Sequence, residues 1–354
     1  MWRRDQSSLH QNNRQSPPNH STIQQFNNLP IMICIYNPNT DPCFNLAAEE
    51  YVLKHFEEDI FMLWRNDKSI IIGKYQNTAA EINADYVKEH NIKVVRRMTG
   101  GGAVFHDLGN VNYTFIGNKG SGDFRTFSEP ILRVMNELGV PAKFEGRNDL
   151  TINGMKFSGT AQCIYKNRIL HHGTLLFASE MSDLTAALKV NPLKFTDKAV
   201  KSVRKRVTNI SEHLPTPMSV TDFIDTVMQN IRENSGDAAM HDFSDKDLQD
   251  ISQLRDEKYS TWEWNFGTSP KFGYSKQMRT GGGNVELNID VEKGLITKIK
   301  FYGDFFSLKE PADFEGLFLG QKYEPANIRN IIEKVEINDY FRNVTTEEMM
   351  ALFF

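Results

Sequence analysis

The sequence is poor in cysteine and has no long apolar run. Its 354 residues include three cysteines, Cys34, Cys43 and Cys163, whose spacing excludes a disulfide scaffold and a cysteine-based zinc site. No segment reaches the roughly 18 consecutive apolar residues that a membrane-spanning helix needs. The formal net charge of −4 supplies no basic field for nucleic acid. We therefore expect a cytoplasmic protein, mitochondrial if eukaryotic, that binds neither nucleic acid nor membrane.

The common signatures of catalysis are also missing. No Gly-Lys-Ser/Thr follows a glycine-rich turn to make a Walker loop, and Gly-x-Gly-x-x-Gly is absent. The Gly-x-Ser-x-Gly elbow of a serine nucleophile is absent too. Cys163 has no evident partner base, so a buried structural thiol is the better interpretation. The sequence thus offers no recognisable nucleophile.

Composition divides the chain into three parts. Residues 1–30 are rich in Asn, Gln, Ser and Pro, and we expect a disordered polar tail because they cannot bury enough apolar surface. Arg3, Arg4 and Arg14 leave a transit peptide open, although no amphipathic apolar face accompanies them. The polar stretch 235–250 suggests a boundary between a domain at 31–245 and a smaller one at 250–354.

Hydrophobic periodicity predicts alternating strands and helices in the first domain. A helix at 46–56 is expected to be capped by Asn45. Strands at 61–64 and 70–72 are expected to pair across the turn at 66–68. Asn153-Gly154 between two apolar runs is a strong hairpin signal. Further predicted elements are strands at 31–36, 92–95 and 111–116, helices at 79–90, 127–138, 182–189 and 221–234, and a β-rich block at 143–176.

The second domain has the pattern of an α+β fold. Strands are predicted at 285–291 and 296–302 across a turn at Lys293-Gly294, with a helix at 311–319. A last pair of elements is expected at 328–335 and 346–354. We interpret Gly281-Gly282-Gly283 as a plain hairpin turn, because no arginine pair flanks it.

The most informative stretch is 96–107, which reads Arg-Arg-Met-Thr-Gly-Gly-Gly-Ala-Val-Phe-His-Asp. Three glycines let backbone N–H groups approach a ligand closely, which favours a nest for phosphate or carboxylate oxygens. Arg96 and Arg97 add planar guanidinium groups suited to oxyanions. A tight turn that binds nothing is the alternative. Asp107 is expected to hold the loop by hydrogen bonds.

Lys156 lies just after the predicted hairpin turn, on a strand that continues with small and polar residues. Such a lysine can supply a fixed charge to a phosphate or a developing oxyanion. The alternative is a solvent-facing lysine on an edge strand. His171 and His172 are consecutive and point to opposite faces of a strand, so packing is favoured over a shared metal. The basic run at 194–206 is either a solvated face or a contact for an acidic partner or phosphate.

Taken together, these stretches resemble the lipoate–protein ligase and lipoyltransferase family, within the biotin/lipoate-ligase superfamily. The likeness runs from about residue 31 to 352 in family order, and the first 30 residues have no counterpart. The segments that carry it are 44–47 with Glu49, 73–77, 96–110, 147–150, 156–161, 171–176, 201–203 and 206–209.

The resemblance implies an α/β (α+β) fold, with a mixed-sheet catalytic domain at 31–245 and a smaller C-terminal α+β accessory domain at 250–354. It implies that lipoate attacks the α-phosphate of ATP, assisted by Mg²⁺, to give lipoyl-AMP and pyrophosphate. A lysine of an acceptor protein then takes the lipoyl group. The implied acceptors are apo lipoyl domains of 2-oxoacid dehydrogenase acyltransferase subunits and the glycine-cleavage H protein, and the implied enzyme is a monomer.

The resemblance also assigns residues. Lys156 would contact the lipoyl carbonyl and the phosphate, and Arg97 with 102–105 would bind nucleotide and intermediate. Small residues, Gly159, Thr160, Ala161 and Gly173, would leave a slot for the dithiolane tail. No metal ligand is assigned. The remaining binding candidates are Arg96, Gly101, Gly102, Ala103, Val104, Phe105, His106, Asp149, Ser158, Thr174 and Lys201.

Three alternatives stay open from the sequence. A lipoyltransferase would use preformed lipoyl-AMP without activating lipoate. An octanoyltransferase of the cysteine type would need a cysteine just upstream of Lys156, and 147–150 contains none. A non-catalytic sensor of lipoate or adenylate would retain the fold without turnover.

Overall fold

The computed structural model describes residues 32–354 except 77, 121, 181–186, 189–206, 267–272, 293–294 and 324. The predicted tail at 1–30, the basic run at 194–206 with Lys201, and the turn at Lys293-Gly294 lie outside the described residues, as does most of the helix predicted at 182–189. None of the described helices is both long enough and apolar enough to cross a membrane.

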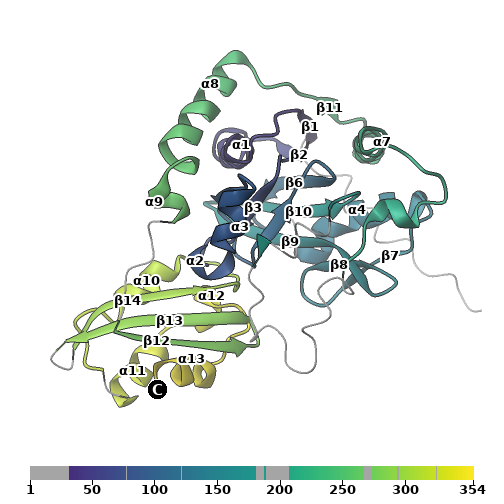
Figure 1. Cartoon of the computed structure of the whole chain (residues 1–354). Helices are drawn as coiled ribbons and strands as arrows, with labels where there is room; N and C mark the ends of the chain where they lie inside the picture. Colours follow the sequence, from purple (N-terminus) through teal and green to yellow (C-terminus); the bar gives the residue numbers. More distant parts are fainter. Residues whose placement is uncertain are drawn as a thin grey trace, which may run out of the picture. The chain divides into compact units, whose positions relative to one another are not determined.

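An eight-stranded mixed sheet dominates the first part of the chain (Figure 1). Its order is β11-β1-β2-β6-β10-β9-β8-β7, with parallel pairing of β1 to β2 and to β11 and antiparallel pairing elsewhere. This confirms the predicted mixed-sheet fold. The strands are β1 (Met32–Asn37), β2 (Asp59–Trp64), β6 (Asn110–Asn118), β7 (Ala142–Glu145), β8 (Asp149–Ile152), β9 (Met155–Tyr165), β10 (Arg168–Leu176) and β11 (Ala239–Met240).

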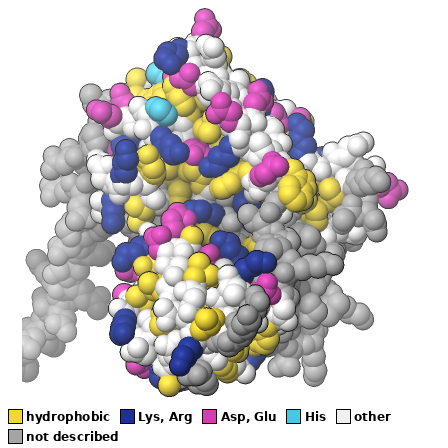
Figure 2. All heavy atoms as spheres, turned by 90° about the vertical axis from the view of Figure 1, so that its left-hand side faces the viewer, with side chains coloured by type: hydrophobic (Ala, Val, Ile, Leu, Met, Phe, Trp, Pro, Cys, Tyr) yellow, Lys and Arg dark blue, Asp and Glu magenta, His cyan; other side chains and the backbone are white. Residues whose placement is uncertain are grey.

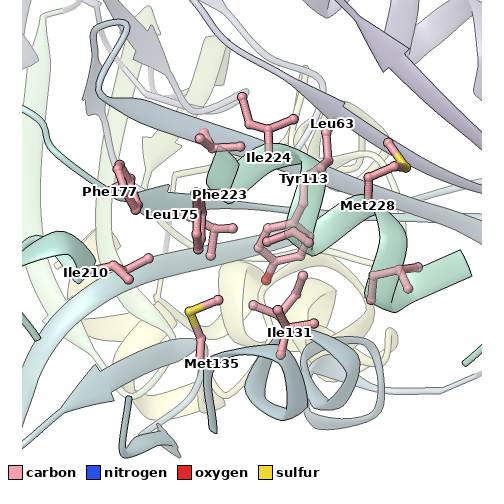
Figure 3. Close-up of a cluster of buried hydrophobic side chains, with 14 of the residues drawn as sticks. Leu63, Tyr113, Ile131, Met135, Leu175, Phe177, Ile210, Phe223, Ile224 and Met228 are labelled. Carbon is pink, nitrogen blue, oxygen red and sulfur yellow. The ribbon is translucent and has the colours of Figure 1, made fainter. Parts of the chain in front are cut away.

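Helices cover both faces of this sheet because its central strands are apolar on both sides. All six residues of β2 are buried, and alternate ones enter different cores. The first core contains α4 (Phe124–Glu137) and α7 (Val220–Glu233), where Ile131 and Phe223 meet Tyr113 of β6 (Figure 3). The second core contains α1 (Pro42–His55) and α8 (Asp245–Leu254).

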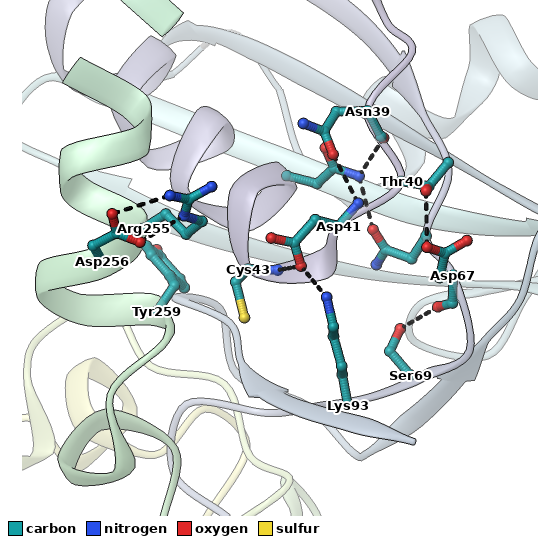
Figure 4. Close-up of polar contacts among 12 residues, drawn as sticks. Asn39, Thr40, Asp41, Cys43, Asp67, Ser69, Lys93, Arg255, Asp256 and Tyr259 are labelled. Atoms are coloured by element: carbon teal, nitrogen blue, oxygen red, sulfur yellow. Dashed lines mark hydrogen bonds and ion pairs between the residues drawn. The ribbon is translucent and has the colours of Figure 1, made fainter. Parts of the chain in front are cut away.

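Helix α1 begins four residues earlier than predicted. Asp41 is the N-cap, its carboxylate accepts from the Cys43 N–H, and Pro42 occupies the first helical position (Figure 4). Asn45 is therefore inside the helix and not its cap. Its buried side-chain amide bonds Asn37 and Asn66, so it ties α1 to the ends of β1 and β2.

Strands at 61–64 and 70–72 both exist, but the prediction that they pair is wrong. β3 (Ser69–Ile72) leaves the large sheet and forms the centre of a separate three-stranded sheet, β4-β3-β5. Its neighbours are β4 (Lys93–Arg96) and β5 (Val104–His106), so the glycine-rich loop connects the two outer strands. The helix predicted at 79–90 is broken into α2 (Thr78–Glu81) and α3 (Ala84–Glu89).

The hairpin predicted at Asn153-Gly154 is confirmed. Both residues have positive φ, 52° and 78°, as a two-residue turn between antiparallel strands requires. The pairing of β8 with β9 shifts between Leu150 and Thr151. Such a bulge re-aims side chains locally, and it lies immediately opposite Lys156.

The C-terminal module, which we define as residues 273–354, is an antiparallel sheet packed against helices. Its strands are β12 (Tyr274–Thr280), which was not predicted, β13 (Gly283–Glu292) and β14 (Leu295–Gly303). Gly281-Gly282 joins β12 to β13, which confirms the predicted hairpin turn. The helices are α10 (Pro311–Gly316), α11 (Pro325–Ile332), α12 (Ile337–Tyr340) and α13 (Thr346–Phe353).

The segment before this module packs on the first part of the chain. It comprises α8, the π-helical turn η4 (Arg255–Tyr259) and α9 (Trp262–Asn265). Ile251 and Tyr259 are fully buried in the core that contains α1. Packing therefore favours a boundary after Asn265, and we call the described residues 32–266 the N-terminal module.

On the face shown in Figure 2, basic and acidic side chains are interspersed.

Candidate functional site

A cavity of about 320 Å³ lies where the small sheet, the large sheet and the C-terminal module meet. Leu46, Trp64 and Ile71 wall the cavity on the side of β2. In the strand order the opposite end is formed at β8 and β9, where Asp149, Lys156 and the adjoining Arg147 line it. The residues that line it are Leu46, Trp64, Ile71, Arg97, Gly101, Gly102, Ala103, Val104, His106, Asn112, Arg147, Asn148, Asp149, Lys156, Gly159, Thr160, Ala161, His172, Gly173, Thr174 and Asp304.

Lys156 and the glycine loop face the same cavity, as the sequence predicted. The Lys156 Nζ lies 2.7 Å from Asp149 Oδ1, and its side chain is 38% exposed. The backbone under it is fixed, because the Lys156 carbonyl accepts from the Thr208 N–H at 2.9 Å. The ion pair with Asp149 thus holds the ammonium at the cavity wall, where the side chain is still partly open to solvent.

Two glycines in the wall make room for neighbouring side chains. A Cβ on Gly159 would lie 2.9 Å from Lys156 Nζ, and a Cβ on Gly173 would lie 2.6 Å from the Tyr113 hydroxyl. The small residues were predicted to leave a slot for an apolar tail. All four line the cavity, but the space at the two glycines is taken by Lys156 and Tyr113.

Arg97 braces the glycine loop from inside. Its buried guanidinium donates to the Thr99 hydroxyl and to the carbonyls of Ile71, Gly100 and Gly102. Burial lowers the pKa of Arg97 to about 10, which leaves it charged at neutral pH. Arg97 also lines the cavity, so its charge is close to any ligand there while most of its N–H groups are used by the loop.

Arg96 does not line the cavity. Its backbone N–H donates to the Asn265 side chain at 2.8 Å, and burial lowers the pKa of its guanidinium to about 10. Arg96 therefore joins the 73–76 turn to α9, and its predicted contact with substrate has no support from this geometry. The guanidinium donates to the Thr78 hydroxyl and to the carbonyls of Gly73, Lys74, Gln76, Trp264 and Asn265.

A buried polar chain connects the loop to helix α1. His172 Nδ1 lies 2.9 Å from Glu49 Oε1, and His172 Nε2 lies 2.8 Å from Thr99 Oγ1. Glu49 also accepts from Thr114 Oγ1. His172 was predicted to be a packing residue, but it is part of the cavity wall.

His171 points to the opposite side of β10, as expected for consecutive strand residues. Its ring stacks on Phe127 with centroids 5.3 Å apart, and Gln162 Nε2 lies 3.0 Å from its Nδ1. Burial lowers the pKa of His171 to about 3, so it is neutral at physiological pH.

Two side chains of the cavity wall, His106 and Asn112, carry buried polar atoms. His106 Nδ1 lies 3.0 Å from Asn66 Nδ2, which makes Nδ1 the acceptor and leaves the proton on Nε2. Burial lowers the pKa of His106 to about 3. Both His106 Nε2 and Asn112 Nδ2 are buried, and neither has a hydrogen-bond partner among the described residues.

Of the other predicted residues, some line the cavity and some do not, and on the strands this follows the alternation of side chains between the two faces. Gly101, Gly102, Ala103, Val104, Asp149 and Thr174 line the cavity. Thr174 Oγ1 accepts from the Gly159 N–H at 3.3 Å. Phe105 and Ser158 are buried on the far side of their strands, Phe105 in the core of the small sheet, and neither lines the cavity.

Sequence reasoning missed the contribution of the C-terminal module. Asp304 lines the cavity, and Phe306 packs on Phe124 and Ala161 beside it. Phe305 accepts from the Gly101 N–H at 3.4 Å, so this segment touches the glycine loop directly. The only available signal was the segment 303–306, Gly-Asp-Phe-Phe, directly after a predicted strand. Arg147 and Asn148 were also missed as site residues, although they lie in a recognised motif.

Comparison with known proteins gives two family matches. The lipoyl protein ligase A/B catalytic domain matches residues 41–232, and the bacterial lipoate protein ligase C-terminus matches residues 269–353. Lipoate-protein ligase LplJ of Bacillus subtilis is 42% identical, over 91% of this chain and 100% of its own length. Lipoate–protein ligase 1 of Staphylococcus aureus is 39% identical, over 89% and 98%.

Solved structures agree with these matches. Plasmodium falciparum LipL1 in complex with lipoate has a TM-score of 0.76 at 27% identity, covering 90% of this chain and 97% of that one. A lipoate-protein ligase A bound with ATP has a TM-score of 0.59 at 27% identity, covering 68% and 100%. The chain therefore belongs to the lipoate–protein ligase family.

Proposed function

We propose that this chain is an ATP-dependent lipoate–protein ligase. It activates lipoate as lipoyl-AMP and passes the lipoyl group to a lysine of an acceptor protein. The observation that carries the proposal is the shared cavity, in which a fixed ammonium, Lys156, faces the Gly101-Gly102 loop beside an apolar end. Relatives that bind lipoate and ATP have this fold.

The cavity suits chemistry on an acyl phosphate. Among the described residues, no cysteine or serine side chain lines it, and an attack of carboxylate on phosphorus needs no enzyme nucleophile. The reaction instead requires that the lipoate carboxylate and the ATP phosphates, both anions, are brought together and that the negative charge on the phosphate oxygens is stabilised. Lys156 and the loop braced by Arg97 supply that positive potential. The end walled by Leu46, Trp64 and Ile71 takes the apolar tail.

Mg²⁺ fits the donor set at the charged end. Asp149 and Asp304 are the carboxylates that line the cavity in the part of the chain that the structure describes. A Mg²⁺ ion bound to nucleotide phosphates needs only one or two protein carboxylates, and these two would hold it. The bound ion would neutralise phosphate charge during the reaction.

The acceptor is proposed to be an apo lipoyl domain of a 2-oxoacid dehydrogenase acyltransferase subunit or a glycine-cleavage H protein. The bi-partite lipoate protein ligase of Thermoplasma acidophilum, 30% identical over 69% of this chain, is described with its E2 lipoyl domain. We propose the cytoplasm as the compartment, which agrees with free thiols at Cys34, Cys43 and Cys163.

The decisive assay is modification of an apo lipoyl domain, read by mass spectrometry. Lipoate with Mg·ATP is supplied in one reaction and synthetic lipoyl-AMP in the other. A ligase modifies the domain in both. Modification with lipoyl-AMP alone would replace the ligase with a lipoyltransferase, and modification in neither would favour the sensor.

A further inference from the structure

Three arginines from distant parts of the sequence lie near the charged end of the cavity, and one of them, Arg147, lines it. Arg147 lies in the turn between β7 and β8, and its guanidinium stacks on the Phe306 ring at 4.5 Å from the centroid. It also donates to the carbonyl of Gly282, in the hairpin turn of the C-terminal module. Arg147 lines the cavity. Its hydrogen bond to the Gly282 carbonyl therefore places the C-terminal hairpin turn at the edge of the cavity.

The other two arginines belong to the C-terminal module and surround the same hairpin. Arg279 Nη1 on β12 lies 3.8 Å from Asp304 Oδ2. The Arg342 N–H donates to the Phe306 carbonyl at 2.9 Å, which places its backbone beside the ring on which Arg147 stacks. Burial lowers the pKa of Arg147, and the nearby charges of Arg279 and Arg342 lower it further.

This cluster carries an excess of positive charge. Asp149, the other carboxylate at this end, is already paired with Lys156. Asp304 lies 3.8 Å from Arg279 and also acts on the charge of Arg147, and Arg342 adds a further positive charge near Arg147. Arg279 and Arg342 are exposed, so both are accessible to a soluble anion. Guanidinium groups bind phosphate through paired N–H groups.

The reaction geometry says which phosphates reach this cluster. The lipoate carboxylate oxygen forms a bond to the α-phosphorus, and the bond from that phosphorus to the bridging oxygen breaks with its electron pair leaving on pyrophosphate. Attacking and leaving oxygens are roughly in line. With the acyl tail at the apolar end and the α-phosphate at Lys156, the leaving group points to the opposite, charged end.

We propose that Arg147, Arg279 and Arg342 form a subsite for the β- and γ-phosphates of ATP and for the pyrophosphate that departs. The subsite spans both modules, since Arg147 comes from the N-terminal module and the other two come from the C-terminal one. The inference rests on the proposed ligase function. Lipoyl-AMP has neither phosphate, so the subsite serves activation and not transfer.

The test compares Arg279→Gln/Arg342→Gln with Arg329→Gln. Arg329 is an exposed arginine of the same module paired with Glu347, away from the cavity. Binding of Mg·ATP and of inorganic pyrophosphate is measured by calorimetry on the full chain, and each half-reaction is assayed separately. We expect the double variant to bind both ligands at least about tenfold more weakly and to transfer from lipoyl-AMP at the control rate.

Other outcomes overturn the proposal. Unchanged affinity for pyrophosphate and ATP in the double variant would remove the subsite. An equal loss in both half-reactions would indicate that the arginines act on the acceptor or on folding. Arg147→Lys gives a second check, because it keeps the charge but loses paired N–H groups, and we expect weaker pyrophosphate binding. If the wild-type chain fails with lipoyl-AMP, the ligase proposal falls, whereas calorimetry still reports on the subsite.

Discussion

The Lys156 ammonium and the Asp149 carboxylate lie 2.7 Å apart across the β8–β9 pair, both at the wall of one cavity. The bulge between Leu150 and Thr151 and the hairpin turn after Ile152 set their relative positions. A bound phosphate would offer the ammonium a second anionic partner, so the pair holds the lysine in place without neutralising the site permanently.

Replacing Lys156 by alanine is expected to lower the rate of lipoyl-AMP formation by about 10²-fold or more, the scale for losing one charge-stabilising donor. The rate of pyrophosphate release in single turnover measures it. Lys143→Ala, on the exposed edge strand β7, is the matched control and should behave as wild type. Equal rates for the two variants would show that Lys156 has no role in activation.

Gly159→Ala tests the position of the lysine and not its presence. The new Cβ would lie 2.9 Å from Lys156 Nζ and 3.1 Å from Cε, so the flexible end of the side chain must move. We expect activation to fall about tenfold, one order of magnitude for a misplaced charged group, with an unchanged melting temperature. Gly316→Ala, where a Cβ meets nothing within 4 Å, is the control. A lowered melting temperature would instead indicate backbone damage.

Arg96→Met is expected to act on stability. It removes the guanidinium donor from five main-chain carbonyls. Gly73 and Asn265 keep another donor, whereas the carbonyls of Lys74, Gln76 and Trp264 lose theirs, and we expect a loss of at least about 3 kcal/mol in the free energy of unfolding. Urea denaturation measures it. Arg329→Met, at an exposed ion pair, should leave that free energy unchanged. A stable Arg96→Met protein with lost ATP affinity would restore the predicted role in ligand binding.

Acid should destabilise the protein through its buried histidines. Burial lowers the pKa of His171 to about 3 from an ordinary 6.5, so between pH 6.5 and 3 the unfolded chain binds one more proton than the folded chain. Stability therefore falls as pH falls through that window, by up to about 1.4 kcal/mol per pH unit for this group. His106 adds a similar effect.

The pH dependence can be assigned with His171→Phe, since the ring already stacks on Phe127. We expect the slope of the free energy of unfolding between pH 6 and 4 to decrease by about 1.4 kcal/mol per pH unit. An unchanged slope in His171→Phe would mean that this histidine is charged in the folded state.

Local signals predicted the parts of the fold that local chemistry decides. Asn153-Gly154 specifies its turn because both residues tolerate positive φ. Helix α1 was misplaced because Asn45 resembles a cap, whereas Asp41 followed by Pro42 is the stronger start signal. Pairing of β2 with β3 was wrong because closeness in sequence does not reveal that β3 joins a different sheet.

The site shows the same division. Lys156 and the glycine loop, which local motif and chemistry singled out, line one cavity, and their roles there stay predictions. Ser158 lies near the lysine in sequence but does not reach the cavity, since neighbouring strand residues face opposite sides. Asp304 could not be found from local patterns, because it comes to the cavity from about 150 residues away, through packing of a second module.

The hydrogen bonds of Arg96 to Trp264 and Asn265 also determine where the polypeptide can be divided. A fragment that ends in the polar stretch before α8 lacks Trp264 and Asn265, so the buried Arg96 guanidinium loses these two acceptors. It also lacks Ile251 and Tyr259, so the core that they cover becomes exposed. A fragment that ends just after α9 retains them. Separate expression of the two halves should therefore succeed with the cut near residue 267 and yield aggregated protein with the cut near 245.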